Sequence, residues 1–589
     1  MVAKYQLNAD KDGQAGSASS SEAGRTIDGE SLRFLRKYAG PYRYRLTAAV
    51  ATAVPIAALG GVMAWAVKKV VEYFSSGGSG KEALFWLIAG LVGVVVRGVL
   101  EVVNRQILIS IHAGIEKDMR LDLYETIHNS PLDFHTHVRT GEIANLIGND
   151  VQFAAGGVVE IYSALWRHPA VIVCLTGVMF YFNPLLSIMG IILFPVLGAC
   201  VGAVGRRAGD AERRFMEKQG RMMGSMVESL TNIREVKAFG RETGQRGELA
   251  KRCDELIASV RRVVLLKSMV WPATETLSGV TIGMMALVAY FQLKNGTTTA
   301  GSIAGCLAAT VALKKPVKAV SAAAVQLQRA FAAIRRIRWV EEAAAEGRGG
   351  KSLDDPVNSV VLQDLTFSYD GRTDILKNVS VEMKRGERIA VIGASGAGKT
   401  SLLDLVTGFY PCRSGSLLVN GTDIRKIDLK SLRKRIGVVS QAPLLFDASI
   451  EDNIRYGNPD AESGDISRAV KAAGCSEMLE RLPDGINTTV GEGGRRLSGG
   501  ERKRVALARA LARPLSVLLL DEVTSELDLC TAESILEVID SLAGDMLIIN
   551  VSHSDLILSH CDRALSLENG FVSEVSPGDI LRGRRNTLR

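Results

Sequence analysis

A glycine-rich loop in the C-terminal half of the chain has the composition of a phosphate-binding loop. Residues 393–400 read Gly-Ala-Ser-Gly-Ala-Gly-Lys-Thr and match the pattern G-x-x-x-x-G-K-[ST]. A strand-like apolar run at 388–392 precedes the loop, and a helix-like run follows it. In this context backbone N–H groups surround phosphates at a helix N-terminus, Lys399 reaches the β and γ phosphates, and Thr400 binds Mg²⁺. The residues expected to contact the nucleotide here are Gly393, Ser395, Gly396, Gly398, Lys399, Thr400 and Ser401.

Two carboxylates follow a second apolar strand further along the chain. The run Val-Leu-Leu-Leu at 517–520 is followed directly by Asp521 and Glu522. Asp521 suits the coordination shell of Mg²⁺, and Glu522 is placed where a base could polarise an attacking water molecule. An acidic pair at a strand end can also cap a helix, but the phosphate-binding loop upstream favours the catalytic interpretation.

A third motif, Leu-Ser-Gly-Gly-Glu at 497–501, lies between the first two. With these three motifs in this order, the sequence resembles the ATPase domain of ABC transporters. The resemblance implies that Tyr369 stacks on adenine, that Gln441 lies near Mg²⁺ and the membrane domain, and that His553 is the switch histidine. It also implies that Ser498, Gly499 and Gly500 contact the γ-phosphate across a dimer. Asp528 matches the D-loop of the family.

The chain departs from the family pattern at two positions. Glu501 stands where the family more often has Gln, and Glu526 stands where a small residue is usual. Neither departure removes a catalytic group. We therefore expect an active ATPase in which the catalytic residues are Glu522, His553 and Gln441, and in which Mg²⁺ is bound by Thr400, Gln441 and Asp521.

The composition of the chain indicates which larger structural elements accompany these motifs. The chain has 589 residues, of which 47% are hydrophobic and 23% are charged. This composition excludes a disordered chain, a collagen-like chain and a small disulfide-bonded scaffold. The apolar residues concentrate in six stretches, each near the ~20 residues that cross a ~30 Å hydrocarbon core. The six predicted spans are 46–67, 83–103, 160–182, 184–204, 269–292 and 301–328.

The connections between these spans alternate in length and charge. Two long connections, 104–159 and 205–268, are rich in Arg and Lys, whereas the other three are short and carry few basic residues. The positive-inside rule therefore places the long connections, both termini and the C-terminal half in the cytoplasm. Much of the net charge of +8 is explained by this orientation. A nucleic-acid partner is not needed to explain it.

These patterns predict a six-span α-helical transmembrane domain fused to an α/β P-loop ABC ATPase domain. A basic amphipathic segment at 31–38 is predicted to form a helix at the membrane surface before the first span. The eight cysteines lie far apart without metal-ligand spacing and are interpreted as free, buried thiols. The predicted divisions are a disordered polar tail at 1–28, the transmembrane domain at 29–340, a linker at 341–355 and the nucleotide-binding domain at 356–589.

Several cations interrupt the predicted spans. Three of the spans place a cation roughly 21–23 Å below their outer ends, at about 1.5 Å per residue. Ionisable groups inside a span are costly and are therefore candidate functional residues. The cations of these spans can form a positive layer that receives phosphate groups in a cavity. Alternatively, they can extend towards lipid headgroups or pair with Glu101, Glu160 or Glu275. The candidate substrate-binding residues are Arg97, Arg167, Lys315 and Lys318.

The resemblance extends to the membrane half. Phe134 and the segments 140–143 and 149–151 look like the first cytoplasmic coupling loop of exporter-type subunits. The second coupling loop is matched by Glu228, the segment 236–239 and Glu242. One ATPase domain on six spans is the half-transporter layout of type IV ABC exporters, which implies a dimer, most simply of two identical chains.

A further likeness concerns the transported molecule. The segments 179–182 and 315–318 look like the corresponding segments of bacterial lipid A flippases. This likeness implies ATP-driven flipping of an anionic lipid across a bacterial inner membrane, with ATP and Mg²⁺ as cofactors and no nucleic-acid partner. The alternatives are a multidrug or peptide exporter, a non-transport ABC ATPase acting on nucleic acid, and a channel or receptor that binds ATP.

Overall fold

The computed structural model divides the chain into two compact units, which are described separately. One unit contains 29–125 and 141–341, and the other contains 126–140 with the C-terminal part from 342 onward. The segment 126–140 thus belongs with the C-terminal unit, although the sequence pattern placed it in the transmembrane domain. The predicted tail and residues 344–349 of the predicted linker lie outside the described residues, which are 29–76, 80–138, 140–343, 350–525, 527, 529–552 and 554–587.

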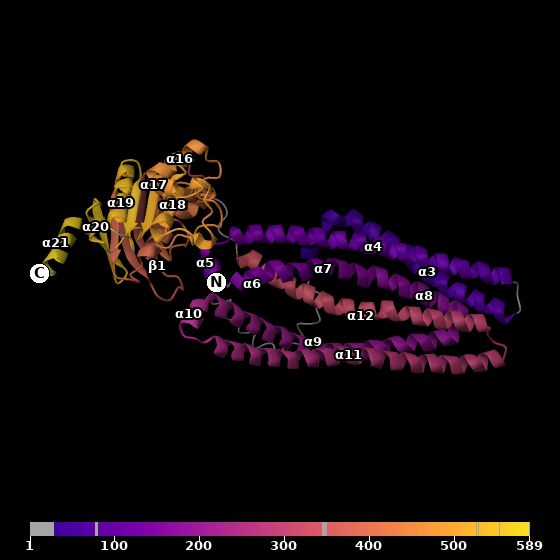
Figure 1. The fold of residues 1–589 in the computed structure, drawn as a ribbon. Helices are drawn as coiled ribbons and strands as arrows, with labels where there is room; N and C mark the ends of the chain where they lie inside the picture. Colours follow the sequence, from indigo (N-terminus) through magenta and orange to yellow (C-terminus); the bar gives the residue numbers. More distant parts are fainter. Residues whose placement is uncertain are drawn as a thin grey trace. The chain divides into compact units, whose positions relative to one another are not determined.

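The first unit consists of long helices that run alongside one another (Figure 1). Helices α9 and α11 lie side by side over much of their lengths. A short helix, α10, lies between them in the chain and reverses its direction. The elements of this unit are α2 (Gly29–Ala39), η1 (Gly40–Tyr42), α3 (Arg43–Ser75), α4 (Gly80–His128), α6 (Thr140–Asn145), η2 (Leu146–Asp150), α7 (Val151–Tyr162), η3 (Ser163–Arg167), α8 (His168–Phe182), α9 (Pro184–Thr231), α10 (Ile233–Ala238), α11 (Glu242–Lys294) and α12 (Ala300–Ala343).

Four helical segments of the described chain are long and apolar enough to cross a membrane: Gly29–Ser75, Gly80–His128, Thr140–Phe182 and Glu242–Lys294. They contain four of the six predicted spans. The other two predicted spans correspond to α9 and α12, which are equally long helices. Three lysines near the middle of α12 lower its apolarity. The count of six spans therefore stays a prediction.

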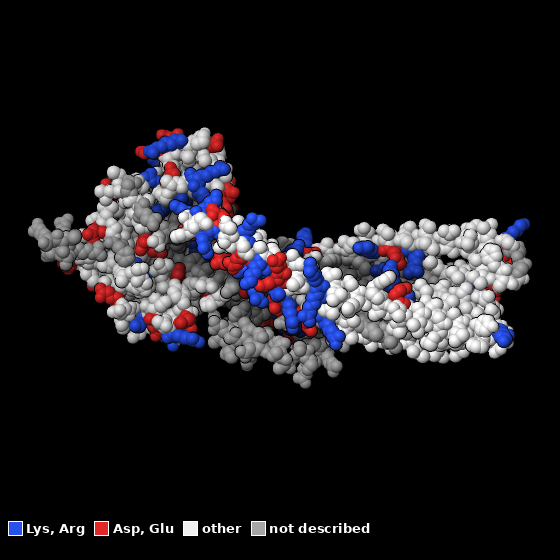
Figure 2. Space-filling view, turned by 60° about the horizontal axis from the view of Figure 1, so that its bottom comes forward, with Lys and Arg blue, Asp and Glu red and all other residues white. Residues whose placement is uncertain are grey.

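The distribution of charge on this unit agrees with a membrane-spanning function. Figure 2 shows a largely uncharged surface over one end of the long helices, interrupted by a compact group of basic and acidic side chains. Large apolar side chains of α4 are exposed there in the single chain, including Val95 and Val99, which are 63% and 58% exposed. An exposed apolar surface of this extent requires lipid or another protein surface to cover it.

The first helix of the unit packs into the bundle. The predicted place of the segment 31–38 at the membrane surface stays a prediction, and within the chain Phe34, Leu35 and Tyr38 of α2 are buried and α2 packs on α7. The hydroxyl of Tyr38 donates to Asp122 at 2.9 Å. Helix α2 therefore uses its apolar face to join the helical bundle.

The second unit contains two β-sheets and the helices around them (Figure 1). An antiparallel sheet has the order β2-β1-β4-β5, and a six-stranded sheet has the order β10-β9-β3-β8-β7-β6. The strands are β1 (Ser359–Phe367), β2 (Leu376–Lys384), β3 (Arg388–Gly393), β4 (Ser414–Val419), β5 (Thr422–Asp423), β6 (Ile436–Val439), β7 (Val517–Asp521), β8 (Leu547–Val551), β9 (Arg563–Glu568) and β10 (Phe571–Val575). The main helices are α5 (Leu132–His137), α13 (Lys399–Val406), α14 (Leu429–Arg433), α15 (Ile450–Arg455), α16 (Ser463–Ala472), α17 (Ser476–Arg481), α18 (Gly499–Leu511), α19 (Leu529–Leu542), α20 (Asp555–Leu558) and α21 (Pro577–Thr587).

The six-stranded sheet positions the two main sequence motifs at one edge. Strands β3 and β7 both pair in parallel with β8. Residues 517–520 of β7 are fully buried, as expected for a strand covered on both faces. Because the carboxyl ends of parallel strands share one edge of a sheet, the loop after β3 and the carboxylates after β7 lie next to each other.

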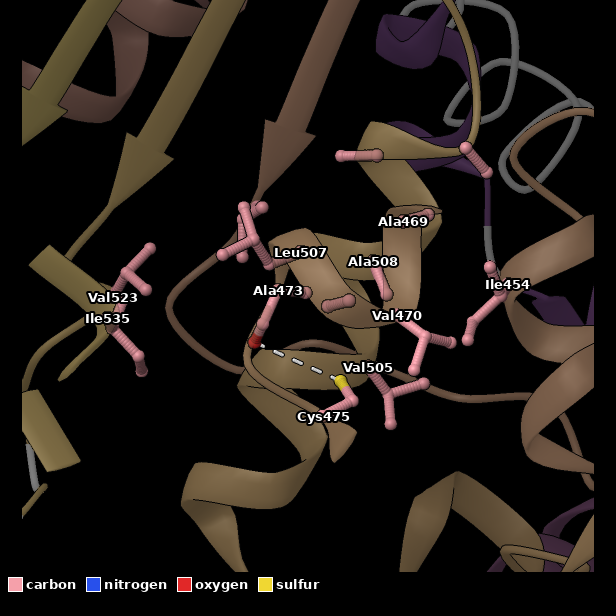
Figure 3. Packing of buried hydrophobic residues seen from close by; sticks show 14 of the residues in the cluster. Ile454, Ala469, Val470, Ala473, Cys475, Val505, Leu507, Ala508, Val523 and Ile535 are labelled. Atoms are coloured by element: carbon pink, nitrogen blue, oxygen red, sulfur yellow. Dashed lines mark hydrogen bonds between the residues drawn. The ribbon is translucent and has the colours of Figure 1, made fainter. Parts of the chain in front are cut away.

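A separate hydrophobic core supports the helices that follow β6 in the chain. Figure 3 shows Val470, Cys475 and Val505 packed together in this core, with the thiol of Cys475 3.9 Å from the carbonyl oxygen of Ala473. Burial raises the pKa of the Cys475 thiol to about 12, so it stays uncharged at neutral pH. Among the described cysteines, the expectation of buried thiols is confirmed for Cys306 and Cys475 and is wrong for Cys530, which is exposed. The other four are only partly buried: Cys174, Cys253, Cys412 and Cys561.

Candidate nucleotide-binding site

The loop between β3 and α13 has a backbone that only glycine accommodates at two positions. Gly393 and Gly398 have φ values of 154° and 102°. A Cβ atom on Gly393 would lie 2.5 Å from the carbonyl oxygen of Leu567, and one on Gly398 would lie 2.8 Å from Ile375. Gly398 is also the N-cap of α13. The loop therefore leads directly into a helix N-terminus, where N–H groups without helical partners can bind an anion.

Lys399 extends back across this loop. Its ammonium group donates to the carbonyl oxygens of Gly393 and Ala394 at 2.9 and 3.0 Å, and the residue is only 7% exposed. A buried ammonium group inside a loop that is lined by N–H groups favours a polyanion. This is the place that the sequence predicted for the β and γ phosphates.

Thr400 and Asp521 join the two motifs. The hydroxyl of Thr400 donates to a carboxylate oxygen of Asp521 at 3.1 Å. Burial is the main cause that raises the pKa of Asp521, and the neighbouring charge of Glu522 raises it further. A buried carboxylate next to a hydroxyl and a second carboxylate provides the hard oxygen ligands that Mg²⁺ prefers. The donor set present therefore fits the metal that the sequence predicted.

Gln441 and Glu522 form a second pair at the same edge. The amide nitrogen of Gln441 donates to a carboxylate oxygen of Glu522 at 2.7 Å. Glu522 has a φ of +50°, a left-handed conformation that is uncommon for a residue with a side chain. Its N–H donates to the carbonyl oxygen of Val551 at 2.9 Å. The backbone of Glu522 is thus held in a strained conformation of the kind that occurs at functional sites.

Lys503 supports this conformation, although no sequence pattern identified it. The residue lies on α18 and is 4% exposed. Its ammonium group donates to the carbonyl oxygens of Ser525 and Glu522 at 2.5 and 3.3 Å. A lysine among several basic residues of a helix is usually solvated, so only the structure identifies this one as a support of the Glu522 turn.

Tyr369, predicted to stack on adenine, lies beside the first turns of α13. Its hydroxyl is 2.9 Å from the hydroxyl of Ser401 and donates to Asp404 at 3.2 Å. Burial is the main cause that raises the pKa of Tyr369 to about 12. The ring is 37% exposed, so part of its surface is open to a ligand. Sequence reasoning did not identify Asp404 as a partner of this tyrosine.

The Leu-Ser-Gly-Gly-Glu motif begins a different helix. Ser498 is the N-cap of α18, and its hydroxyl accepts from the N–H of Glu501 at 3.3 Å. The carboxylate of Glu501 accepts from the N–H of Ser498 at 2.8 Å. Glu501 therefore completes a capping box, which shows that this departure from the family pattern keeps a local function. Gly499 and Gly500 form the first turn of α18.

Three of the residues predicted from sequence cannot be placed. Asp528, His553 and Glu526 lie outside the described residues. The D-loop and switch functions of Asp528 and His553 stay predictions. The other predicted residues of the ATP site lie on the loop before α13, on α13, after β6, at the end of β7 and at the start of α18.

Comparison with known families agrees with this geometry. Residues 46–314 match the family described as "ABC transporter transmembrane region", and residues 376–525 match the family described as "ABC transporter". The chain belongs to the ABC transporters. It is an ATP-hydrolysing transporter and a multi-pass integral membrane protein with an exporter-type transmembrane domain.

Individual relatives cover nearly the whole transporter. The chain is 28% identical over 557 residues to the ATP-dependent lipid A-core flippase of Syntrophus aciditrophicus (strain SB), an alignment that covers 94% of this chain and 92% of the relative. It is 29% identical over 469 residues to the putative multidrug export ATP-binding/permease protein YgaD of Bacillus subtilis (strain 168), with 79% of this chain and 81% of the relative covered.

A solved structure supports the fold. The structure of a bacterial Atm1-family ABC exporter with ATP bound superposes with a TM-score of 0.81 at 24% identity. The superposition covers 92% of this chain and 96% of the other. The predicted combination of a helical transmembrane domain and an ABC ATPase domain is therefore confirmed.

In the membrane half of this ABC transporter, the predicted cations are found in different surroundings. Arg167 is next to His168 in the chain, and Lys315 of α12 lies within electrostatic range of the same histidine. Arg97 instead pairs with Glu101 on its own helix at 3.2 Å. Lys318 is exposed on α12.

Two further features concern these cations: a pairing with Glu275, which was one of the alternatives given by the sequence, and a π-helical turn, which was not predicted. Lys314, one residue before Lys315, is 3.6 Å from Glu275 of α11. Arg167 ends η3, a π-helical turn that interrupts the helix before Pro169. Such turns commonly mark functional sites, and the cause of this one is visible in the sequence, because proline disrupts the helix before it.

Proposed function

We propose that two copies of this chain form an exporter that uses ATP to flip an anionic lipid of the lipid A class across a bacterial inner membrane. The observation that carries the ATP-driven part is the arrangement of Lys399, Thr400, Asp521 and Glu522 at one edge of the six-stranded sheet. In this proposal the ATPase domain and both termini lie in the cytoplasm, as the positive-inside rule predicts.

The residues of the ATP site take separate functions in this proposal. Thr400 and Asp521 hold Mg²⁺, with Gln441 nearby, and the bound metal neutralises charge on the phosphates. Lys399 and the N–H groups of the loop bind the phosphates. Glu522 orients and polarises the attacking water, and the hydrogen bond from Gln441 fixes the carboxylate for that task.

A dimer is supported by the separation of two elements that each ATP would need. The phosphate-binding loop begins α13, whereas the Ser-Gly-Gly sequence of 498–500 begins α18. The family resemblance implies that this sequence contacts the γ-phosphate held by another ATPase domain. Because the chain carries one copy of each element, two identical chains would complete two equivalent sites.

The lipid substrate is supported by two observations. Several relatives that match most of the chain are named ATP-dependent lipid A-core flippases. In addition, the predicted spans carry the cations Arg97, Arg167, Lys315 and Lys318, which suit phosphate groups. A drug exporter would favour an apolar, aromatic surface.

The deciding experiment identifies the lipid. The protein is purified in nanodiscs formed from its native membrane, and the bound lipids are analysed by mass spectrometry. We expect a phosphorylated glycolipid, together with stimulation of the ATPase by purified lipid A. An Arg167→Gln/Lys315→Gln variant should lose most of that stimulation and keep its basal ATPase, whereas the control Lys294→Gln, at the end of α11, should keep both. Stimulation by hydrophobic drugs without a bound glycolipid would overturn the lipid assignment in favour of a multidrug exporter.

A further inference from the structure

Three aromatic rings pack against one another beside the nucleotide site. The ring of Tyr369 lies edge-on to Phe367 and to Tyr410, with centroids 4.7 and 4.9 Å apart and interplanar angles of 80° and 85°. Tyr410 also contacts Phe367, at 5.9 Å between centroids. Edge-to-face contacts at these distances are favourable and directional. Phe367 is 1% exposed and anchors the group, whereas Tyr369 keeps an open surface.

Tyr410 connects this aromatic group with a segment that is distant in sequence. Its hydroxyl lies 3.2 Å from the hydroxyl of Thr136, 274 residues earlier in the chain. Thr136 is on α5, which belongs to the same compact unit as the two sheets. Phe134 anchors α5 in this unit, because it is only 7% exposed. A displacement of α5 therefore acts on Tyr410 through the hydrogen bond.

The backbone turn that precedes Tyr410 is held in place by hydrogen bonds and a ring contact. After α13, Arg433 donates to the carbonyl oxygens of Thr407 and Gly408 at 3.2 and 2.8 Å. The guanidinium group also lies over the ring of Phe409, 5.2 Å from its centroid. These contacts hold the turn that carries Tyr410, so its side chain is the part that can respond to α5.

We infer that Tyr410 is a positioning residue that transmits the position of α5 to Tyr369 and thereby sets the affinity of the site for the adenine base. The inference rests on the proposed function, in which Tyr369 stacks on adenine. Helix α5 contacts Tyr410, Tyr410 contacts Tyr369, and Tyr369 contacts Ser401 and Asp404 of α13. By thermodynamic reciprocity, binding of the base then biases the position of α5 as much as α5 biases binding of the base.

The test removes one hydroxyl at a time from the full-length protein in lipid nanodiscs. Tyr410→Phe keeps the ring, and Thr136→Val keeps the shape of the other partner. Binding of the non-hydrolysable analogue adenylyl imidodiphosphate with Mg²⁺ should weaken in each variant by about two- to tenfold, the range for one neutral hydrogen bond. The double variant should bind no more weakly than the single ones, because both remove the same interaction.

Inorganic tripolyphosphate separates positioning of the base from general damage to the site. It has no base, so its affinity should be the same in the wild type and in all variants. An equal loss of tripolyphosphate binding, or unchanged analogue binding in both single variants, would overturn the inference. The matched control Tyr456→Phe removes the hydroxyl of a tyrosine that is 62% exposed in the same unit and should change neither affinity.

A Tyr369→Ala variant distinguishes failure of this inference from failure of the proposed site. Its affinity for the analogue should fall towards its affinity for tripolyphosphate, and adding Tyr410→Phe should then have no further effect. If Tyr369→Ala has no effect, the adenine contact itself is wrong and the inference fails with it. If Tyr369→Ala weakens binding but Tyr410→Phe does not, only the function of Tyr410 is wrong.

Discussion

The side-chain amide of Gln441 donates to the carboxylate of Glu522 at 2.7 Å, across the edge of the sheet where β6 and β7 end. The amide donor fixes one carboxylate oxygen of Glu522. Because the backbone of Glu522 is also held by Val551 and Ser525, the carboxylate is positioned before any nucleotide binds. Preorganisation of this kind lowers the cost of reaching the transition state.

Replacing Glu522 by Gln should stop ATP turnover and keep ATP binding. An amide has nearly the same shape but cannot polarise the attacking water as a base. Loss of a general base typically costs 10²- to 10⁴-fold in rate, so we expect the ATPase rate to fall by about that factor. ATP binding, measured by protection against thermal unfolding, should change little. ATPase activity equal to that of the wild type would show that another group is the base.

Replacing Lys503 by Met should lower both stability and activity. The carbonyl oxygen of Ser525 would lose the donor from Lys503, whereas that of Glu522 keeps the N–H and hydroxyl of Ser525 as donors; an unsatisfied acceptor costs about 1–3 kcal/mol. The same change frees the turn that holds Glu522, so the ATPase rate should fall further than the unfolding temperature alone explains. The control is Lys471→Met at an exposed position of α16. If the two variants have equal ATPase rates, Lys503 does not position Glu522.

The residues that sequence reasoning identified in the ATP site share one property: their function depends on spacing within one segment. Lys399 and Thr400 are set by the loop pattern, and Asp521 and Glu522 by the end of a buried strand. The hydrogen bond between Thr400 and Asp521 confirms that the two motifs are adjacent. They are adjacent because strands β3 and β7 run parallel and end at the same edge of the sheet.

The residues that sequence reasoning missed depend on contacts between distant segments. Lys503 is one of several basic residues on α18, and only its burial under the Glu522 turn distinguishes it. Tyr410 meets Thr136 across 274 residues. In the membrane half, the predicted layer of Arg97, Arg167 and Lys315 stays a prediction. Depth along a helix does not give the direction in which a side chain points, and Arg97 pairs with Glu101 of its own helix.

Replacing Asp521 by Asn should stabilise the nucleotide-free protein at neutral pH. Burial raises the pKa of Asp521, so the folded protein favours the protonated form, and ionisation at neutral pH lowers stability. The gain from Asn should shrink as the pH falls through the raised pKa of the folded state towards the usual Asp value near 3.9. Thermal unfolding between pH 7.5 and pH 4.5 measures this trend. A gain that grows on acidification would show that the pKa is shifted in the opposite direction.

The same variant tests the metal site. Mg²⁺ with ATP should raise the unfolding temperature of the wild type more than ATP with EDTA does, because a ligand that binds the folded state stabilises it. In Asp521→Asn that difference should be small, since a neutral amide is a poorer ligand for Mg²⁺ than a carboxylate. An equal effect of Mg²⁺ in both proteins would exclude Asp521 from the metal site.

An ion pair between Asp150 and Arg336 in the helical unit provides a last prediction. Asp150, in η2, is 3% exposed, and Arg336 of α12 donates two hydrogen bonds to its carboxylate at 2.7 and 2.5 Å. This contact raises the pKa of Arg336, so the guanidinium group stays charged. Arg336→Met would leave the buried carboxylate without this partner. We expect a loss of about 2–3 kcal/mol, at the low end for a buried pair because half of the Arg336 side chain is exposed.

The adjacent arginine provides the matched control. Arg335 is exposed one position earlier on α12, so Arg335→Met removes the same charge without touching Asp150. Thermal unfolding in detergent should show a clear decrease for Arg336→Met and little change for Arg335→Met. An Asp150→Asn/Arg336→Met double variant should recover part of the loss, because it removes the uncompensated buried charge. Without that recovery, the loss would have to come from the packing of the Arg336 side chain, and the ion pair would not be its cause.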